Sequence, residues 1–267
     1  MNVSPEMRAN ICRTLQSVEA MYGAHILYAI ESGSRVWGFE STNSDYDVRF
    51  IYRKAPADYL SVYPRSDCIE NPPQNDGILD FSGWDVKKTF LLFRKSNPAL
   101  FEWLHSPIVY RSPSPEIQEL QKLSKAFFNP RAGIYHYLHM AEGNYRTYLK
   151  GDEVPLKKYF YVLRPILACF AVKETHTVPP VTFDELLKFA PKDFPLYDVD
   201  SLLFLKRYGK ELDKGPRLQR INDWIDCTLP MLLKEAAMAP VASDSNLANL
   251  DTLLASTILR GHVNANY

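Results

Sequence analysis

The spacing of apolar residues changes near residue 114, and this change limits the fold more than any other feature of the chain. Before it, apolar residues form short runs bounded by polar or turn-forming residues, which predict β-strands. These runs are residues 25–30, 46–52 and 78–82. After it, apolar residues recur every three or four positions, which predicts helices. We therefore predict an α+β fold, with a mixed sheet and flanking helices over residues 1–113 and a C-terminal helical domain over residues 114–267.

Two aspartates at the second of these runs are the main candidates for chemistry. Asp45 and Asp47 are separated by one residue, and because side chains alternate along a strand, both project from the same face. Carboxylates placed in this way can bind hard divalent cations through oxygen. Gly33 and Ser34 follow the preceding run, where a glycine lets the backbone approach a phosphate and the serine hydroxyl and nearby amides donate to it. The segment therefore combines a candidate metal site with a candidate nucleotide-binding turn.

Each of these features is common on its own, since Gly-Ser pairs and Asp-x-Asp sequences occur in many turns. Their order is more specific, because Asp45 and Asp47 introduce charge into an apolar strand that would not accept it without a reason. The segment resembles the DNA polymerase beta-like nucleotidyltransferase superfamily, whose signature is Gly-Ser, roughly ten residues, and then Asp-x-Asp or Asp-x-Glu. Arg35 and Gly38 give the Gly-Ser-Arg-x-x-Gly form that is typical of its small bacterial members.

A narrower resemblance extends over about residues 25–190. The matching segments are DFSGWDVKK at 80–88, NPALFEWL at 97–104 followed by Ser106-Pro107, and KKYFYVLRP at 157–165. They resemble the nucleotidyltransferases that are linked to RNA repair and named for their association with RNA ligase. The resemblance implies a catalytic domain over 1–113 and a helical domain over 114–267 that contributes to the substrate cleft. It also implies dependence on two Mg²⁺ or Mn²⁺ ions, and transfer of a nucleoside monophosphate from a nucleoside triphosphate to a hydroxyl acceptor.

The superfamily resemblance further implies a third carboxylate from a later strand, and two aspartates qualify. Asp80 stands inside the run 78–82, where a strand would place it on the face opposite the apolar residues beside it. It can equally be a carboxylate that only faces water. Asp85 precedes a predicted helix, and a role as its N-cap accounts for it without any chemistry. We therefore predict that Asp45, Asp47 and Asp80 are the metal-binding and catalytic residues, with Asp85 as the alternative third carboxylate.

Beyond the Gly-Ser turn, five residues are candidates for binding the nucleotide. Arg35 directly follows that turn and can neutralise a phosphate, or it can be a solvated helix residue. Lys157, Tyr161 and Arg164 lie at i, i+4 and i+7 of one predicted helix, and Lys158 follows the first of them. Such a face suits a triphosphate or a nucleic-acid backbone, and it equally suits a solvated helix surface.

The charge balance restricts how a nucleic acid can bind. Lys and Arg together number 31, as do Asp and Glu, so an RNA partner would be held by a local basic patch and not by net charge. The expected partners are a nucleoside triphosphate, with ATP as the default donor, and an RNA end as the acceptor. Two alternatives stay open: adenylylation of a protein or small-molecule hydroxyl, and a non-catalytic nucleotide-binding or RNA-binding partner on the same fold. The presence of both Asp45 and Asp47 favours an enzyme.

Other patterns in the sequence narrow the function class and the compartment. The four cysteines include no Cys-x-x-Cys pair, which argues against a zinc site and a disulfide framework. The sequence contains no Walker-type Gly-Lys-Ser/Thr, no dinucleotide fingerprint and no Gly-x-Ser-x-Gly elbow. We see no N-terminal targeting pattern and no apolar stretch of the roughly 18 residues that a membrane span requires. These observations predict a cytoplasmic protein with no membrane partner.

Overall fold

The computed structural model describes residues 3–41, 44–63, 65–74, 77–208, 213–239 and 247–260. Its strands are β1 (His25–Ser32), β2 (Tyr46–Arg53), β3 (Cys68–Gln74), β4 (Leu79–Asp85), β5 (Val109–Arg111), β6 (Glu153–Pro155) and β7 (Lys214–Pro216). Its helices are α1 (Pro5–Tyr22), α2 (Gly33–Trp37), α3 (Pro56–Tyr59), α4 (Val86–Arg94), α5 (Pro98–Leu104), α6 (Pro115–Phe127), α7 (Pro130–Tyr148), α8 (Lys158–Thr175), α9 (Phe183–Leu186), the 3₁₀ turn η1 (Leu187–Phe189), α10 (Leu196–Tyr208), α11 (Gln219–Ala236) and α12 (Leu247–Leu259). The three predicted strands are confirmed as β1, β2 and β4, and the predicted helical part is confirmed by α6 to α12.

A five-stranded mixed sheet organises the first part of the chain, in the order β3-β4-β2-β1-β5. The central strand β2 is antiparallel to β1 and parallel to β4. The register places Asp47 of β2 opposite Ser32 of β1 and opposite Asp80 of β4. Residues that are paired directly across neighbouring strands project from the same face. Asp47 and Asp80 therefore lie side by side on one face of the sheet.

Several helix ends follow the capping residues that the sequence predicts. The side chain of Ser4 accepts a hydrogen bond from the backbone N–H of Met7 at 3.1 Å, and α1 ends at Gly23, whose φ of +57° is left-handed. Asp85 caps α4 by accepting the backbone N–H of Lys87 at 2.8 Å. The N-cap role expected of Asp85 is thus confirmed.

Strand β4 is longer than the sequence predicts, because it continues past Ser82 to Asp85. The extra residues keep the alternation of buried and half-buried side chains, and Trp84 stacks on Trp103 of α5 with ring centroids 3.7 Å apart. Asp85 follows Asp80 by an odd number of positions, so the two carboxylates point to opposite faces of the sheet. The longer strand therefore does not bring Asp85 to the face that carries Asp47.

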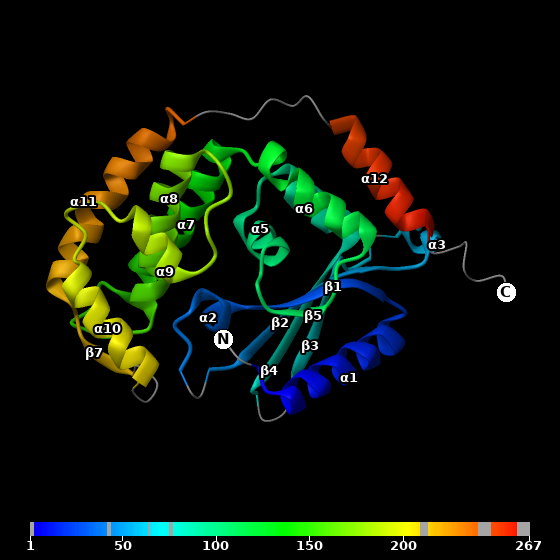
Figure 1. Ribbon diagram of the computed structural model, residues 1–267, viewed down its shortest axis with the longest axis horizontal. Helices are drawn as coiled ribbons and strands as arrows, with labels where there is room; N and C mark the ends of the chain where they lie inside the picture. Colours follow the sequence, from blue (N-terminus) through cyan, green and yellow to red (C-terminus); the bar gives the residue numbers. More distant parts are fainter. Residues whose placement is uncertain are drawn as a thin grey trace.

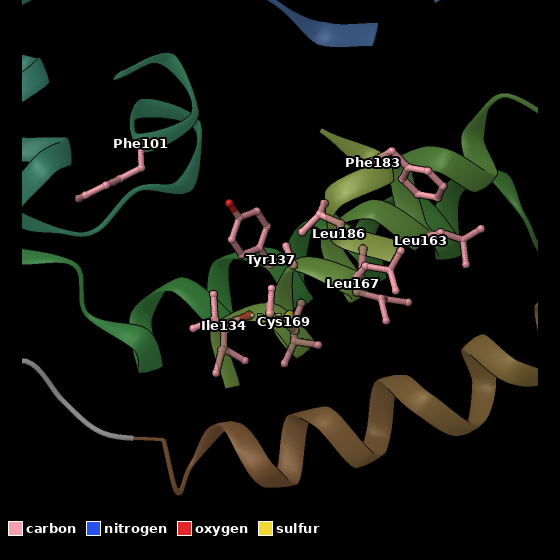
Figure 2. Close-up of a cluster of buried hydrophobic side chains, with 14 of the residues drawn as sticks. Phe101, Ile134, Tyr137, Leu163, Leu167, Cys169, Phe183 and Leu186 are labelled. Atoms are coloured by element: carbon pink, nitrogen blue, oxygen red, sulfur yellow. Dashed lines mark hydrogen bonds between the residues drawn. The ribbon is translucent and has the colours of Figure 1, made fainter. Parts of the chain in front are cut away.

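Two apolar clusters cover the two faces of the sheet. On one face, Ile11 and Leu15 of α1 pack with Val48 and Phe50 of β2. On the other face, a larger cluster includes α4 and α5, against which α12 and α6 pack, and continues into α7 to α11, which lie beside the sheet (Figure 1). Figure 2 draws a portion of this cluster from α5, α7, α8 and α9, and it labels Phe101, Ile134, Tyr137, Leu163, Leu167, Cys169, Phe183 and Leu186.

The larger cluster runs from β1 to α12, so the sheet and the helical part share one core. The last strand of the five-stranded sheet ends at Arg111 and α6 begins at Pro115, and the domain boundary near residue 113 stays a prediction. The small antiparallel pair of β6 and β7 interrupts the helices of the second part. In the described part of the chain, we find no helix with both the length and the apolar character that a membrane span needs.

Candidate active site

Gly33 makes room for the side chain of Asp47. It is the first residue of α2, and its φ of +66° lies in the left-handed region. A Cβ at Gly33 would lie 2.0 Å from Oδ2 of Asp47 and 2.9 Å from its Cγ, closer than real Cβ atoms come to other atoms. Glycine is therefore required here both by the backbone conformation and by the contact. The fold thus brings the Gly-Ser turn and the Asp-x-Asp segment together.

Asp47 and Asp80 face each other across an arginine that the sequence analysis did not single out. Nη2 of Arg49 donates to Oδ1 of Asp47 at 2.9 Å and to Oδ2 of Asp80 at 2.7 Å. The alternation of side chains that aligns Asp45 with Asp47 also places Arg49 on that face, so this pattern could have identified Arg49 from the sequence. Burial raises the pKa of Asp47, Arg49 lowers it, and the charges of Asp80 and Asp45 raise it again. The two carboxylates therefore share one positively charged partner, the guanidinium of Arg49.

A pocket of about 110 Å³ lies between the two parts of the chain. The first part contributes Ser34, Phe39, Ser44, Asp45 and Asp47, and the second part contributes Lys157, Tyr161 and Lys206. Three larger hollows, of about 280, 320 and 530 Å³, are lined by other residues. Of these four hollows, the smaller pocket is the one that combines Asp45 and Asp47 with basic side chains of the helical part.

The donor atoms of this site suit magnesium or manganese. Carboxylate oxygens are the hard ligands that these ions prefer, and a divalent cation would offset the burial and the nearby carboxylate charges that raise the pKa of Asp47. Among the residues that the structure describes, no three His, Cys, Asp or Glu side chains surround one point closely enough to hold an ion. Asp47 and Asp80 converge on Arg49, and Asp45 lines the same pocket from the segment before β2. The residues therefore fit a divalent ion by their chemistry and by the pairing of two of the three.

Arg35 is not among the side chains that line this pocket. Its Nε donates to the carbonyl oxygen of Asp45 at 3.2 Å, and its Nη2 donates to the carbonyl oxygen of Ser44. The guanidinium lies over the ring of Tyr46, with 3.7 Å between its central carbon and the ring centroid. Arg35 is thus not a solvated helix residue, because it holds the segment that leads into β2.

The residues predicted to share one face of α8 are separated in the structure. Lys157, just before α8, and Tyr161 both line the pocket. Lys158 does not, because its ammonium lies 4.6 Å from the ring centroid of Tyr161 and 4.2 Å from that of Tyr148 of α7. Burial and the adjacent charge of Lys157 lower the pKa of Lys158. Lys158 therefore contacts the pocket through the ring of Tyr161.

Arg164 lies in the core, which corrects the prediction that it belongs to a nucleotide-binding face. Its side chain is 3% exposed, and its Nη1 donates to Oε1 of Glu102 at 2.9 Å. Its Nε and Nη2 donate to the carbonyl oxygen of Val181, and its guanidinium lies 4.5 Å from the ring centroid of Trp37. Most positions of α8 are buried, so a residue seven positions after Lys157 faces the core and not solvent.

Lys206 of α10 lines the pocket and was missed by the sequence analysis. It is 5% exposed, and its Nζ donates to Oγ of Ser41 at 3.2 Å. The next residue, Arg207, donates to the carbonyl oxygen of Gly38 from Nε at 2.9 Å and from Nη2 at 2.6 Å. Helical spacing in the sequence could have identified it, since position 206 continues the buried series of Val199, Leu202 and Leu203. A lysine at a core position of a helix is uncommon unless it has a polar partner.

Glu31 is a buried carboxyl behind Asp47. It lies on β1, where its Oε1 accepts the backbone N–H of Asp47 at 3.0 Å and its Oε2 accepts the hydroxyl of Tyr110. Burial raises the pKa of Glu31 to about 7, although both hydrogen bonds act to lower it. The backbone of Asp47 is therefore held by a carboxyl group that titrates near neutral pH.

We expect Glu31→Gln to flatten the pH dependence of stability. Between pH 4.5 and pH 7 the folded chain keeps a proton on Glu31 that the unfolded chain releases, so the free energy of unfolding falls as pH rises through this window. The fall attributable to Glu31 is about 3 kcal/mol. Urea unfolding at about pH 5 and about pH 8 measures it. Relative to the wild type, the variant should have a higher free energy of unfolding at the higher pH than at the lower one. Parallel pH profiles for the two proteins would contradict this assignment.

The RlaP family model, described as "RNA repair pathway DNA polymerase beta family", matches residues 7–256. The match covers nearly the whole chain. The chain belongs to this family. The uncharacterized protein YcgL of Bacillus subtilis (strain 168) is 42% identical to it over 253 residues, which are 94% of this chain and 96% of that protein.

Membership of the RlaP family confirms the resemblance that the Gly-Ser and Asp-x-Asp segments indicate, and the mixed α+β architecture is that of a polymerase beta-like nucleotidyltransferase. Among solved structures, a nucleotidyltransferase-like protein from Exiguobacterium sibiricum 255-15 aligns with 93% of this chain and 78% of its own. The identity is 13% and the TM-score is 0.32, so we base the fold on the family match. The chain is therefore a member of a nucleotidyltransferase-like family of the RNA repair pathway.

Proposed function

We propose that this protein is a metal-dependent nucleotidyltransferase that moves a nucleoside monophosphate from a nucleoside triphosphate to a hydroxyl at an RNA end. One observation carries the proposal: Asp45 and Asp47 share a pocket with Ser34 and with the basic side chains of Lys157 and Lys206. Carboxylates attract divalent cations, and hydroxyl and ammonium groups attract phosphate oxygens. The metal ion and the phosphates of a metal-bound nucleoside triphosphate therefore both have binding partners in one small pocket.

Asp45, Asp47 and Asp80 are the residues that would hold the metal. The chemistry that Mg²⁺ or Mn²⁺ supplies in such a site is neutralisation of charge on the reacting phosphate and activation of the acceptor hydroxyl. Asp80 is the more open of the facing pair, because its side chain is 45% exposed and that of Asp47 is 29% exposed. We therefore assign to Asp80 the side of the site that the acceptor approaches, where its carboxylate can take the proton of the hydroxyl.

The phosphates are assigned to the turn at Gly33 and Ser34 and to the basic residues opposite it. A pocket of about 110 Å³ is smaller than the roughly 300 Å³ of a typical small-molecule site, so it suits a phosphate tail better than a whole nucleotide. Lys157 and Lys206 would neutralise the tail, and Tyr161 forms the wall next to them. We keep ATP as the default donor and the cytoplasm as the compartment.

An RNA end is favoured as the acceptor by the RNA repair pathway in the family description. The decisive experiment offers the protein each α-labelled nucleoside triphosphate with Mg²⁺ or Mn²⁺, and with RNA oligomers, proteins or small alcohols as acceptors. We expect label to reach RNA with the wild type and not with Asp47→Asn. Label on a protein or a small alcohol would support the adenylylation alternative. Nucleotide binding without transfer to any acceptor would support a non-catalytic role.

We expect Gly33→Ala to lower nucleotidyl transfer by about 100-fold, because its Cβ would displace the Asp47 carboxylate. It should also lower the free energy of unfolding by about 1–2 kcal/mol, since alanine is strained in the left-handed conformation. Gly23→Ala is a matched control: its φ is +57°, and a Cβ there meets nothing within 4 Å. That control should lose similar stability and keep full activity. Equal activity losses in the two variants would contradict a specific role for the contact between Gly33 and Asp47.

A further inference from the structure

One side chain, Arg35, contacts three consecutive residues at the point where the chain enters β2. It donates to the carbonyl oxygens of Ser44 and Asp45 and stacks on the ring of Tyr46. A guanidinium can do all of this at once because its N–H groups form a planar fork whose face is left for an aromatic ring. Arg35 therefore connects the first turn of α2 to the segment that carries Asp45.

Asp45 needs such a contact more than Asp47 does. The pairing of β2 with β4 begins at Tyr46, and its pairing with β1 ends at Asp47, so neither ladder includes Asp45. The backbone of Asp47 is fixed on both sides and is also held by Glu31. The carbonyl oxygen of Asp45 is held instead by Nε of Arg35 at 3.2 Å. Arg35 therefore helps to fix the backbone from which the side chain of Asp45 projects.

We propose that Arg35 is a positioning residue that fixes Asp45 for metal binding, and that it is not a ligand of the nucleotide phosphates. The proposal rests on the proposed function in one respect, namely that Asp45 holds a divalent ion. It is supported by the hydrogen bonds of Arg35 to two backbone carbonyls and by its place outside the pocket lining. Residues that orient metal ligands typically change metal affinity about 10–100-fold when they are replaced.

Arg35→Lys separates the two roles, because lysine keeps the positive charge and loses the planar fork. We would measure Mn²⁺ binding calorimetrically without nucleotide, and kcat and KM for the nucleoside triphosphate, in the wild type, Arg35→Lys and Arg35→Gln. Both variants should bind Mn²⁺ about 10-fold more weakly and show a lower kcat. Their KM for the nucleoside triphosphate should stay within about twofold of the wild type, because positioning a metal ligand adds no direct contact with the phosphates. A phosphate ligand would give the opposite result: unchanged Mn²⁺ affinity, a raised KM in Arg35→Gln, and near-normal behaviour in Arg35→Lys.

Controls keep the result tied to Arg35. Arg53→Gln changes an arginine at the other end of β2 and should leave Mn²⁺ affinity unchanged. If the Arg35 variants fail to fold, Tyr46→Leu, which removes only the stacking partner, should still weaken Mn²⁺ binding. Unchanged affinity in the folded variants would overturn the role of Arg35 alone. A wild type that binds no Mn²⁺ would overturn the metal site and this proposal together.

Discussion

Asp80→Asn is expected to abolish nucleotidyl transfer and to leave the melting temperature of the protein unchanged. Asp80 lies opposite Asp47 in the parallel pairing of β2 with β4, and both carboxylates bind Nη2 of Arg49. The substitution removes a charged oxygen ligand from a half-exposed side chain and leaves no cavity in the core. Loss of a residue that acts as part of a catalytic unit typically lowers kcat by about 1,000-fold or more. Transfer of an α-labelled nucleotide and a thermal unfolding curve measure the two effects.

Asp85→Asn is the matched control, since the same change is made on the opposite face of the same strand. Asp85 is 7% exposed, caps α4 through the N–H of Lys87 and accepts the hydroxyl of Tyr59 at 2.8 Å. We expect only a slight loss in the free energy of unfolding, because asparagine is also a good N-cap residue, with substantial activity kept. If Asp85→Asn abolished transfer and Asp80→Asn did not, the assignment of the third carboxylate would be wrong.

Arg164→Met is expected to lower the free energy of unfolding by about 3–5 kcal/mol, because it leaves Glu102 as a buried carboxylate without its ion-pair partner. The Glu102 side chain is 10% exposed, and it also accepts the hydroxyl of Tyr137 and the indole N–H of Trp37, each at 3.2 Å. This group of side chains joins α2, α5, α7 and α8. Urea unfolding followed by circular dichroism measures the loss.

The double variant Glu102→Gln/Arg164→Met distinguishes an ion pair from simple packing. Glutamine keeps acceptors and donors for Trp37 and Tyr137 while it removes the unpaired charge, so the double variant should recover much of the stability that Arg164→Met loses. No recovery would show that the packing of Arg164 on Trp37 dominates. An Arg164→Met variant with normal stability and a raised KM for the nucleoside triphosphate would restore the nucleotide-binding role.

Local patterns correctly predicted most of the sheet and the strands that carry Asp47 and Asp80, because they depend on rules that act over a few residues. Alternation along β2 places Asp47 on the face away from the buried Val48 and Phe50, and capping chemistry identifies Asp85 as the N-cap of α4. The place of Asp80 needed only one further step, since two parallel strands in register present their matching residues on one face. Such rules do not require knowledge of which helix packs against which.

The errors and omissions concern side chains whose role depends on distant parts of the chain. Helical spacing alone does not show which side of α8 faces the core, so the predicted face included Arg164, which instead pairs with Glu102 of α5. Lys206 reaches the pocket because α10 folds back onto Ser41, a contact between residues far apart in sequence. The sequence correctly places Arg35 beside the Gly-Ser turn. Its contacts with Ser44 and Asp45 depend on how the loop before β2 folds, which the sequence pattern does not show.

The central place of β2 has a consequence for how the protein fluctuates. Amide hydrogens of a strand that is bonded on both sides exchange with solvent mainly through large-scale unfolding, whereas outer helices open locally at lower cost. β2 lies between β4 and β1, so the amides from Val48 to Ile51 should be among the most slowly exchanging in the described chain. Lys206 is carried by α10, which lies at the outer side of the helical part (Figure 1). We therefore expect Lys206 to move away from the pocket more readily than Asp47 does.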